Sequence, residues 1–347
     1  MILFVLAIVI GLVLLVWSAD RFVDGAVGVA QFLGMSTFLI GMVIVGFGTS
    51  APEIVVSILS ALNRTPQLAL GNAYGSNIAN IALILGTTAI IAPVVVHKQA
   101  MKRDIPVLIL MTALTIYLVK DGNVSMLDGI ILLLAFVAVM TFNILKELHD
   151  KRKRKNAMAA DVLENALENA LVESPEKVSI VKSLLWLFVG LGVLVGSSRM
   201  LVWGAIGMAQ ALGVSDLLIG LTIVAVGTSL PELASSIAAA RKGENDLAVG
   251  NVIGSNIFNT LVVVGIAAVI TPIQATDPKV LSRDLPIMSA LTLLLFFICF
   301  PLIKSKRKKT VGKEDERFGF GRIGGALFLL LYVGYLVLLG LEANGMI

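Results

Sequence analysis

The chain has 347 residues, of which 57% are hydrophobic and only 14% are charged, with a formal net charge of +4. A soluble domain is about a quarter charged, so this composition excludes a soluble fold and predicts a polytopic membrane protein. The basic residues lie in short loops without interleaved aromatic residues, which excludes a nucleic-acid-binding surface. The single cysteine, Cys299, permits no intramolecular disulfide.

Ten segments fit the length of about 20 apolar residues that a membrane-spanning helix needs. The predicted spans are residues 1–19, 37–62, 69–94, 105–120, 125–147, 182–201, 216–240, 248–272, 285–304 and 322–342. We interpret the apolar start of the chain as the first span because it lacks the basic region and small-residue cleavage site of a signal peptide. A cleaved signal is the alternative.

These spans predict three parts: a five-helix repeat at 1–147, a linker at 148–181 and a second five-helix repeat at 182–347. The linker begins basic and becomes acidic, and residues 160–173 have the spacing of a short amphipathic helix. We expect the linker to be a connector, with a regulatory element as the alternative.

An internal duplication relates the two halves. Residues 48–80 begin GTSAPE and end GNAYGSNIAN, and residues 227–259 begin GTSLPE and end GNVIGSNIFN, at an offset of 179 residues without a gap. Counted from Ala30 and Ala209, 27 of 51 aligned positions are identical, which is far above chance. Because each half holds five spans, an odd number, the halves enter the membrane from opposite sides. This predicts an all-α fold of ten transmembrane helices in two inverted-topology repeats, an architecture used by transporters.

The positions of Lys and Arg predict the orientation. With the N-terminus outside, 22 of these residues lie in cytoplasmic loops or at their edges and 5 lie outside. Cytoplasmic loops carry the excess of positive charge. Both termini are therefore expected outside, and the linker in the cytoplasm.

Each copy of the motif carries one carboxylate, Glu53 or Glu232, inside an apolar run. An ionisable residue there is costly and indicates a functional site by default. Helical spacing places further oxygen-bearing side chains on shared faces. The four stripes are Thr49, Glu53 and Ser57; Asn72, Ser76 and Asn80; Thr228, Glu232 and Ser236; and Asn251, Ser255 and Asn259. We expect these stripes to face one another or water rather than lipid.

Gly48 with Pro52, and Gly227 with Pro231, predict a break in the second and seventh spans. Proline in a helix interior removes a hydrogen bond and clashes one turn back. We therefore expect free backbone carbonyls near Gly46 and Ala225. Irregular backbone at membrane depth is tolerated where it lines a cavity, and paired breaks in two halves point to a transport site.

Several residues have a structural interpretation beside the functional one. Small residues serve close helix packing, serines can bond back to their own helix, and charges at span ends form interfacial pairs. The residues concerned are Gly71, Gly75, Gly250 and Gly254 for packing; Ser57 and Ser236 for back-bonding; and Arg103, Asp104, Arg283, Asp284, Asp20, Asp24 and Asp128 for flanking charges. His97 and His149 lie at loop edges and are expected to be solvated.

The donor set contains only oxygen, which suits a hard cation such as calcium with its 6–8 oxygen ligands. Zinc would favour nitrogen or sulfur. Two glutamates carry two negative charges, so one Ca²⁺ makes the site neutral, whereas three Na⁺ leave one positive charge. Exchange of three sodium ions for one calcium ion would therefore depend on voltage.

The doubled pattern, GTS-x-PE followed by GNxxGSNI, resembles the cation/calcium antiporter superfamily and is most similar to its prokaryotic sodium/calcium exchangers. The resemblance covers nearly the whole membrane part but not the linker. It implies a multi-pass protein of a prokaryotic plasma or inner membrane, with spans 2, 3, 7 and 8 around four cation sites and spans 1 and 6 sliding against them. The implied ligands are Glu53, Glu232, Thr49, Ser50, Thr228, Ser229, Ser76, Asn80, Ser255 and Asn259, and the carbonyls expected to be free near Gly46 and Ala225 complete the candidate set. Potassium-dependent relatives carry Asp at the position of Asn259, so potassium coupling is not implied.

We therefore predict a sodium/calcium antiporter rather than an enzyme, with Na⁺, Ca²⁺ and the lipid bilayer as partners, no cofactor and no obligate protein partner. Cation/proton exchange is the alternative because a buried Glu can hold a proton. An enzyme with Ser50 or Ser229 as nucleophile is disfavoured because the repeats contain no histidine to act as the base. A channel is also less suited to inverted repeats, which serve alternating access.

Overall fold

The computed structural model describes residues 1–96, 100–165, 179–213, 225–274, 276–299 and 318–343, and most of these residues are helical. The first half contains α1 (Ile2–Leu33), α2 (Thr37–Ile40), η1 (Gly41–Val45), α3 (Gly46–Thr49), α4 (Ala51–Leu62), α5 (Gln67–Ala79), η2 (Asn80–Leu85), α6 (Gly86–Ile91), β1 (Val94–Val96), η3 (Ala100–Asp104), α7 (Ile105–Val119) and α8 (Met126–Asn165). The second half contains α9 (Ile180–Ala211), α11 (Ala225–Thr228), α12 (Leu230–Arg241), α13 (Asn245–Ile257), η5 (Phe258–Val263), α14 (Val264–Ile270), η6 (Val280–Asp284), α15 (Leu285–Cys299), β2 (Phe318–Phe320) and α16 (Arg322–Ala343). The η elements are π-helical turns.

Seven helices among the described residues are long and apolar enough to cross a membrane. An eighth candidate is the pair Thr37–Thr49 and Ala51–Leu62, which is bent by 45°. The predicted span 216–240 lies partly outside the described residues, and its described part contains α11 and α12. The predicted bounds of the first and sixth spans were too short, because α1 and α9 have 32 residues each.

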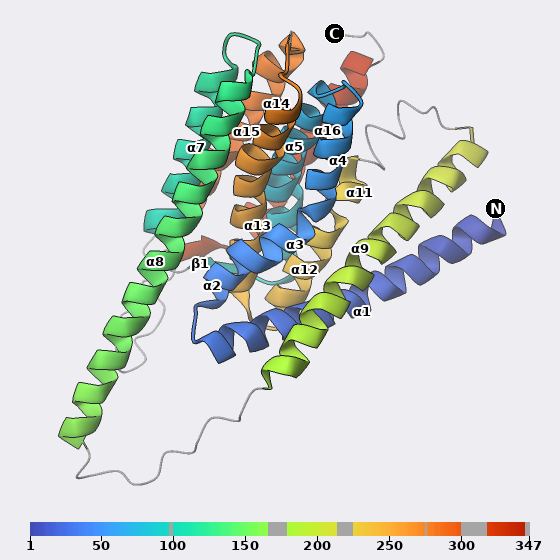
Figure 1. Ribbon diagram of the computed structural model, residues 1–347. Coiled ribbons are helices and arrows are strands. Elements are labelled where there is room, and N and C mark those ends of the chain that lie inside the picture. Colours follow the sequence, from blue (N-terminus) through green and yellow to red (C-terminus); the bar gives the residue numbers. More distant parts are fainter. Residues whose placement is uncertain (97–99, 166–178, 214–224, 275, 300–317, 344–347) are drawn as a thin grey trace.

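Helices α1 and α9 run in opposite directions beside the bundle formed by the other helices (Figure 1). Their closest approaches occur at glycines. Gly11 of α1 lies against Leu201 of α9, and Gly190 of α9 lies against Phe22 of α1. The two glycines are 179 positions apart, and so are their two partners. The contacts of this pair therefore repeat with the offset of the sequence duplication.

The same repetition occurs inside the bundle. Gly86 of α6 lies against Gly325 of α16, and Gly265, which is 179 positions after Gly86, lies against Gly129 of α8. The third span of each half thus packs on the fifth span of the other half. Short extended pairings also occur in both halves. β1 pairs with β2 in antiparallel fashion, and an isolated antiparallel bridge joins the α7–α8 loop to the segment that follows α14.

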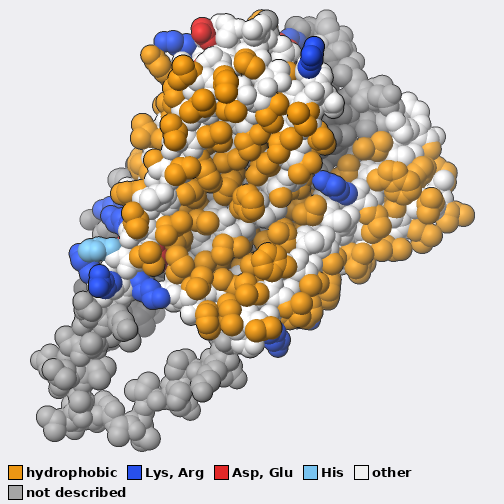
Figure 2. Space-filling view, viewed as in Figure 1, with side chains coloured by type: hydrophobic (Ala, Val, Ile, Leu, Met, Phe, Trp, Pro, Cys, Tyr) orange, Lys and Arg blue, Asp and Glu red, His pale blue; other side chains and the backbone are white. Residues whose placement is uncertain are grey.

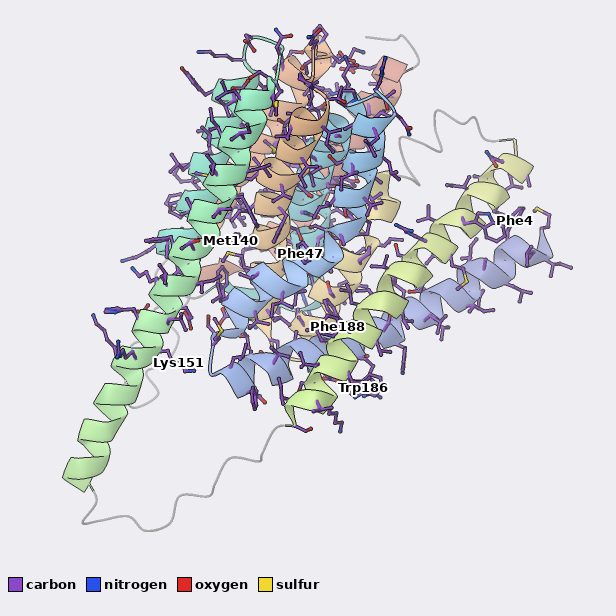
Figure 3. All side chains as sticks on the ribbon, viewed as in Figure 1. Phe4, Phe47, Met140, Lys151, Trp186 and Phe188 are labelled. Carbon is purple, nitrogen blue, oxygen red and sulfur yellow. The ribbon has the colours of Figure 1, made fainter. Side chains whose placement is uncertain are left out.

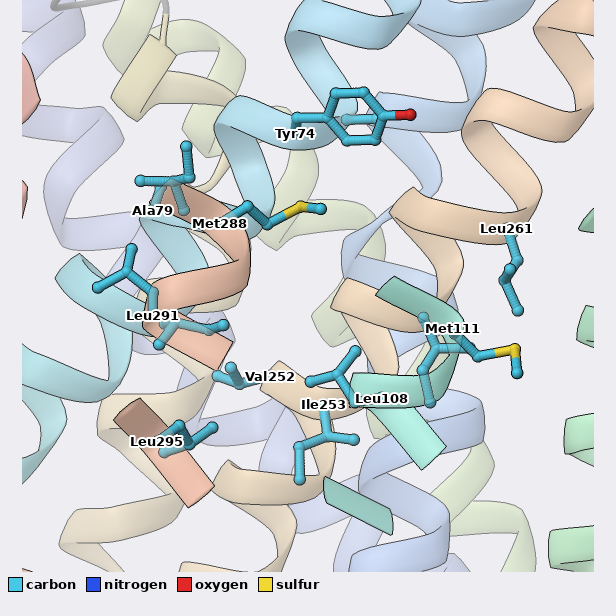
Figure 4. Packing of buried hydrophobic residues seen from close by; sticks show 14 of the residues in the cluster. Tyr74, Ala79, Leu108, Met111, Val252, Ile253, Leu261, Met288, Leu291 and Leu295 are labelled. Atoms are coloured by element: carbon cyan, nitrogen blue, oxygen red, sulfur yellow. The ribbon is translucent and has the colours of Figure 1, made fainter. Parts of the chain in front are cut away.

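Apolar packing between α5, α7, α13 and α15 forms the centre of the bundle (Figure 4). Tyr74 of α5 and Met288 of α15 are fully buried there, as are Leu108 of α7 and Ile253 of α13. The outer face is also covered with apolar side chains, while charged side chains gather toward its ends (Figure 2). A surface of this kind is expected where lipid replaces water as the solvent.

The predicted close packing is present for Gly250 and Gly254. A Cβ atom on Gly250 would overlap the carbonyl of Phe38, and one on Gly254 would overlap the carbonyl of Met42. Helix α13 therefore crosses α2 and η1 backbone to backbone. Gly71 and Gly75 correspond to Gly250 and Gly254 in the duplication. The positions that correspond to their partners Phe38 and Met42, 179 residues later, lie outside the described residues.

Helix α8 continues beyond the predicted end of its span at residue 147 and reaches Asn165, so the first part of the predicted linker is helical (Figure 1). Its side chains contact the joint between α1 and α2. The Ser36 amide donates to Glu147 Oε1 at 3.0 Å, and Lys151 Nζ donates to the Leu33 carbonyl at 2.5 Å (Figure 3). The joint turns at Gly34, whose φ is +58°.

The predicted interfacial ion pairs are present. Arg103 Nε lies 2.8 Å from Asp104 Oδ1, and Arg283 Nε lies 2.7 Å from Asp284 Oδ1. Both aspartates are buried, and each is the last residue of a π-helical turn that leads into an apolar helix. Arg283 also contacts Glu342 at the end of α16. Asp20 and Asp24 are exposed within α1, His149 is exposed within α8, and Asp128 lies in the first turn of α8, whereas His97 lies outside the described residues.

Candidate cation-binding site

The predicted breaks occur at Ser50 and Ser229. Ser50 separates α3 from α4 and Ser229 separates α11 from α12, with nearly equal backbone angles (φ −82°, ψ 2° and φ −92°, ψ 8°). A proline follows two positions later in each copy, at the start of the second helix, where its missing N–H costs nothing. The same local sequence thus produces the same break in both halves.

Glu53 and Glu232 lie in the first turn of α4 and α12, and both are only 1% exposed. A carboxylate is stabilised in that position because the helix dipole is positive at its N-terminus. The hydroxyl of Ser50, three positions before Glu53, donates to Glu232 Oε1 at 3.4 Å. The two carboxylates, 179 residues apart in sequence, therefore converge on one buried region.

Each carboxylate leaves one buried oxygen, Oε2, without a hydrogen-bond partner in the described part of the chain. Buried charges without partners cost several kcal/mol. Such oxygens are the atoms to which a cation would bind. Among the described residues, no three His, Cys, Asp or Glu side chains are placed so that they could hold a metal ion together. Neutral oxygens must therefore complete any coordination shell around the two glutamates.

The third and eighth spans supply such neutral donors. Ser76, Asn80, Ser255 and Asn259 are all buried. Asn80 Nδ2 donates to Asn256 Oδ1 at 3.0 Å, while its own Oδ1 has no partner. Both polar atoms of Asn259 are also unpartnered within the described residues. These side chains lie next to the π-helical turns η2 and η5, which begin at Asn80 and Phe258.

Of the remaining candidates, Thr49, Ser50 and Ser229 are buried, and the Ser229 hydroxyl has no partner in the described chain. Thr228 is half-buried. The Gly46 carbonyl is not free as predicted, because it accepts the Ser50 amide at 3.0 Å, which leaves one lone pair for a ligand. Ala225 begins α11 at the edge of the described segment.

The interpretation of Ser57 and Ser236 as residues that bond back to their own helices was wrong. The Ser57 hydroxyl donates to the Val263 carbonyl in the other half at 2.6 Å. Ser236 Oγ accepts a hydrogen bond from Asn251 Nδ2 at 2.9 Å. Both serines therefore join one helix to another.

Sequence reasoning did not single out Asn77, Asn256, Thr260 and Ser198. Asn77 Nδ2 donates to Thr260 Oγ1 at 2.8 Å, which links the third and eighth spans a second time. Ser198 Oγ donates to the Gly227 carbonyl at 3.1 Å and links α9 to the break before α12. The available signal was the identity of Asn77 and Asn256 across the duplication.

The comparisons with known proteins agree with this arrangement. The profile of the family described as "Sodium/calcium exchanger protein" matches residues 3–145 and 182–341. The putative antiporter CaxA of Alkalimonas amylolytica is 41% identical over 332 residues, which cover 96% of this chain and 97% of that protein. The sodium/calcium exchanger MaX1 of Methanosarcina acetivorans is 30% identical, with 96% and 97% coverage. The solved structure of the sodium-calcium exchanger NCX_Mj superimposes with a TM-score of 0.75 at 31% identity, covering 96% of this chain and 97% of that one.

Proposed function

This chain belongs to the sodium/calcium exchanger family of membrane antiporters, and from that membership we propose that it exchanges Na⁺ for Ca²⁺ by alternating access. The observation that carries the proposal is the convergence of Glu53 and Glu232, each with one unpartnered buried oxygen. Relatives named as sodium/calcium exchangers support the choice of ions.

The proposed ligands are the oxygen atoms around these two acids. We assign the cation sites to Glu53, Glu232, Thr49, Ser50, Thr228, Ser229, Ser76, Asn80, Ser255 and Asn259, with the carbonyls of Gly46 and Ala225. Their burial and the unpartnered atoms of Asn80 and Asn259 support this assignment. Calcium prefers 6–8 oxygens, and a site with two carboxylates becomes neutral when it binds one Ca²⁺. Three Na⁺ would leave one positive charge, so exchange in that ratio would be electrogenic.

The proposed architecture is ten membrane-spanning helices in two inverted repeats, residues 1–147 and 182–347, joined by the cytoplasmic linker 148–181. The contacts that recur with the offset of 179 residues, Gly11 with Leu201 and Gly190 with Phe22, support a two-fold relation between the halves. The excess of Lys and Arg in alternate loops supports an N-terminus outside the cell.

The test is flux into vesicles that contain the purified protein. Vesicles loaded with sodium are diluted into medium with radioactive calcium, and sodium, potassium, proton and voltage gradients are imposed one at a time. Calcium uptake that requires internal sodium supports the proposal. Uptake no greater than in sodium-free vesicles would remove it.

Cation/proton exchange is the second candidate. The unpartnered Oε2 atoms of both glutamates could each hold a proton instead of a cation. Calcium uptake driven by a pH gradient in the absence of sodium would favour this candidate over the first.

A further inference from the structure

Asn251 is hydrogen-bonded to both halves of the chain beside the acidic pair. It is 1% exposed and lies on α13. Its Nδ2 lies 2.9 Å from Ser236 Oγ, 3.1 Å from Ser235 Oγ and 3.3 Å from the Glu232 carbonyl oxygen. Its Oδ1 lies 3.1 Å from Thr49 Oγ1 in the other half. All polar atoms of this side chain are therefore used.

The orientation of the amide follows from its neighbours. The Glu232 carbonyl can only accept a hydrogen bond, so the nitrogen of Asn251 must face it. The oxygen of Asn251 then faces Thr49, whose hydroxyl must donate the proton. Other acceptors within reach of that proton are the Val45 carbonyl at 3.1 Å, the Gly46 carbonyl at 3.5 Å and Ser255 Oγ at 3.5 Å.

When the Thr49 hydroxyl donates its proton to Asn251, the lone pairs of its oxygen remain for a cation. The second contact of Asn251 acts on the other half, because its bond to the Glu232 carbonyl and to two serines of α12 fixes the first turn of that helix. One side chain thus orients a hydroxyl from the first half and a carboxylate-bearing turn from the second.

The corresponding residue of the first repeat, Asn72, does not form this network. Its Nδ2 has no partner in the described part of the chain, and it is less buried than Asn251. Ser57, the counterpart of Ser236, donates to the Val263 carbonyl at 2.6 Å instead of contacting Asn72. The network is therefore complete on one side only, and in the first repeat Val56 stands at the position of Ser235, one of the partners of Asn251.

We infer that Asn251 is a positioning residue of the cation site, which presents the Thr49 oxygen and the Glu232 turn to the ion without binding the ion itself. This inference rests on the proposed function. Hydrogen-bonding partners of this kind typically raise metal affinity about 10–100-fold.

The experiment compares wild type, Asn251→Leu and Asn72→Leu as purified full-length proteins. Leucine has the same branching and the same number of side-chain heavy atoms as asparagine, and it removes every hydrogen bond of the side chain. The concentration of Ca²⁺ that gives half of the maximal shift in unfolding temperature is measured for each protein, and so is the half-saturating Ca²⁺ concentration for flux. We expect Asn251→Leu to raise both values about 10–100-fold and Asn72→Leu to raise them much less.

A merely structural role has a different signature. It would lower the unfolding temperature without ions and the maximal flux, but leave the half-saturating Ca²⁺ concentration unchanged, and this result would overturn the inference. Equal shifts in the two leucine variants would overturn it too. If Asn251→Leu yields no folded protein, Asn251→Ala, which removes the same bonds and adds no bulk, is measured against Asn72→Ala by the same criteria.

A double substitution tests whether Asn251 acts through Thr49. In protein that already carries Thr49→Val, adding Asn251→Leu should raise the half-saturating Ca²⁺ concentration by a clearly smaller factor than in wild type. Equal factors in the two backgrounds would contradict positioning through Thr49. The titration of the wild-type protein distinguishes failure of this inference from failure of the proposed function. Wild-type protein that binds neither Ca²⁺ nor Na⁺ would overturn the proposed function itself.

Discussion

The hydroxyl of Ser50 donates to the carboxylate of Glu232, although the two residues are separated by 182 positions in the sequence. Ser50 lies at the break of one repeat and Glu232 lies one turn after the break of the other. The two breaks therefore face each other, and the helix that begins at each contributes its positive end to the same buried region. Repulsion between the carboxylates is tolerable there only with a compensating cation or proton.

The first prediction concerns the acids. We expect Glu53→Gln and Glu232→Gln each to abolish sodium-dependent calcium uptake, because one carboxylate cannot balance a divalent ion in an apolar site. Both variants should remain folded, since the substitution removes a buried charge and preserves shape. Glu244→Gln, at the turn before α13, is the control and should retain wild-type uptake. Uptake at the wild-type rate in either site variant would contradict the assignment.

The second prediction concerns the crossing of α13 with η1. Gly254→Ala would place a methyl group on the Met42 carbonyl. Overpacking of this kind costs about 1–3 kcal/mol, so the free energy of unfolding should fall by that amount, and the thermal unfolding temperature of the purified protein should fall with it.

The matched control for Gly254 is Gly334→Ala on α16. Gly334 is exposed, and a Cβ there meets nothing within 4 Å among the described residues. Alanine favours a helix over glycine, so stability should stay equal or rise slightly. Indistinguishable unfolding temperatures for the two variants would refute the close crossing.

The third prediction concerns an ion pair on one side of the molecule. Lys242 Nζ lies 2.7 Å from Asp24 Oδ1, which ties the end of α12 to α1. In the other repeat the same positions hold Asn63 and Trp203, so no equivalent ion pair can form. The pair should therefore stabilise one arrangement of α1 against the bundle relative to its two-fold counterpart.

Because both partners of this pair are partly exposed, the stabilisation is about 0.2–1 kcal/mol, or at most about fivefold in population. Lys242→Asn should shift the half-saturating Ca²⁺ concentrations at the two membrane faces in opposite directions by up to that factor. Asp24→Asn should do the same, and about 1 M inert salt should remove the difference by screening. A shift of both faces in the same direction would count against this interpretation.

The fourth prediction concerns orientation. In protein with Cys299→Ser, the exposed residues Asn63 and Arg241 are replaced one at a time by cysteine. A maleimide that cannot cross the membrane should label Asn63→Cys in intact cells, and should label Arg241→Cys only after permeabilisation. The reverse pattern would place the N-terminus in the cytoplasm.

Sequence could predict the acidic pair because the motif around Glu53 recurs without a gap around Glu232, and a polar residue in an apolar helix must face other protein. It also predicted the breaks at Ser50 and Ser229, where glycine and proline act locally. These features depend on neighbours within one turn of the chain, and for that reason the pattern of residue types was sufficient.

The hydrogen bonds of Ser57 and Asn251 could not be predicted in this way. Ser57 and Ser236 are identical residues in equivalent positions, yet one bonds to Val263 and the other to Asn251. Val263 is 206 positions from Ser57 and Asn251 is 15 positions from Ser236, so neither contact is set by neighbours within one turn of the chain. The continuation of α8 through residues 148–159 was missed for another reason, because this polar part of the helix has no apolar periodicity to indicate it, whereas residues 160–165 are helical as the amphipathic spacing of 160–173 predicted.

That extension has a mechanical consequence. Glu147 and Lys151 are one turn apart on α8, and together they hold the last carbonyl of α1 and the first amide of the segment that begins α2. A displacement of α8 along its axis by a single residue, about 1.5 Å, would put both bonds under tension at once. A force applied to the end of α8 would therefore reach the joint on which α1 turns without first passing through the ion site.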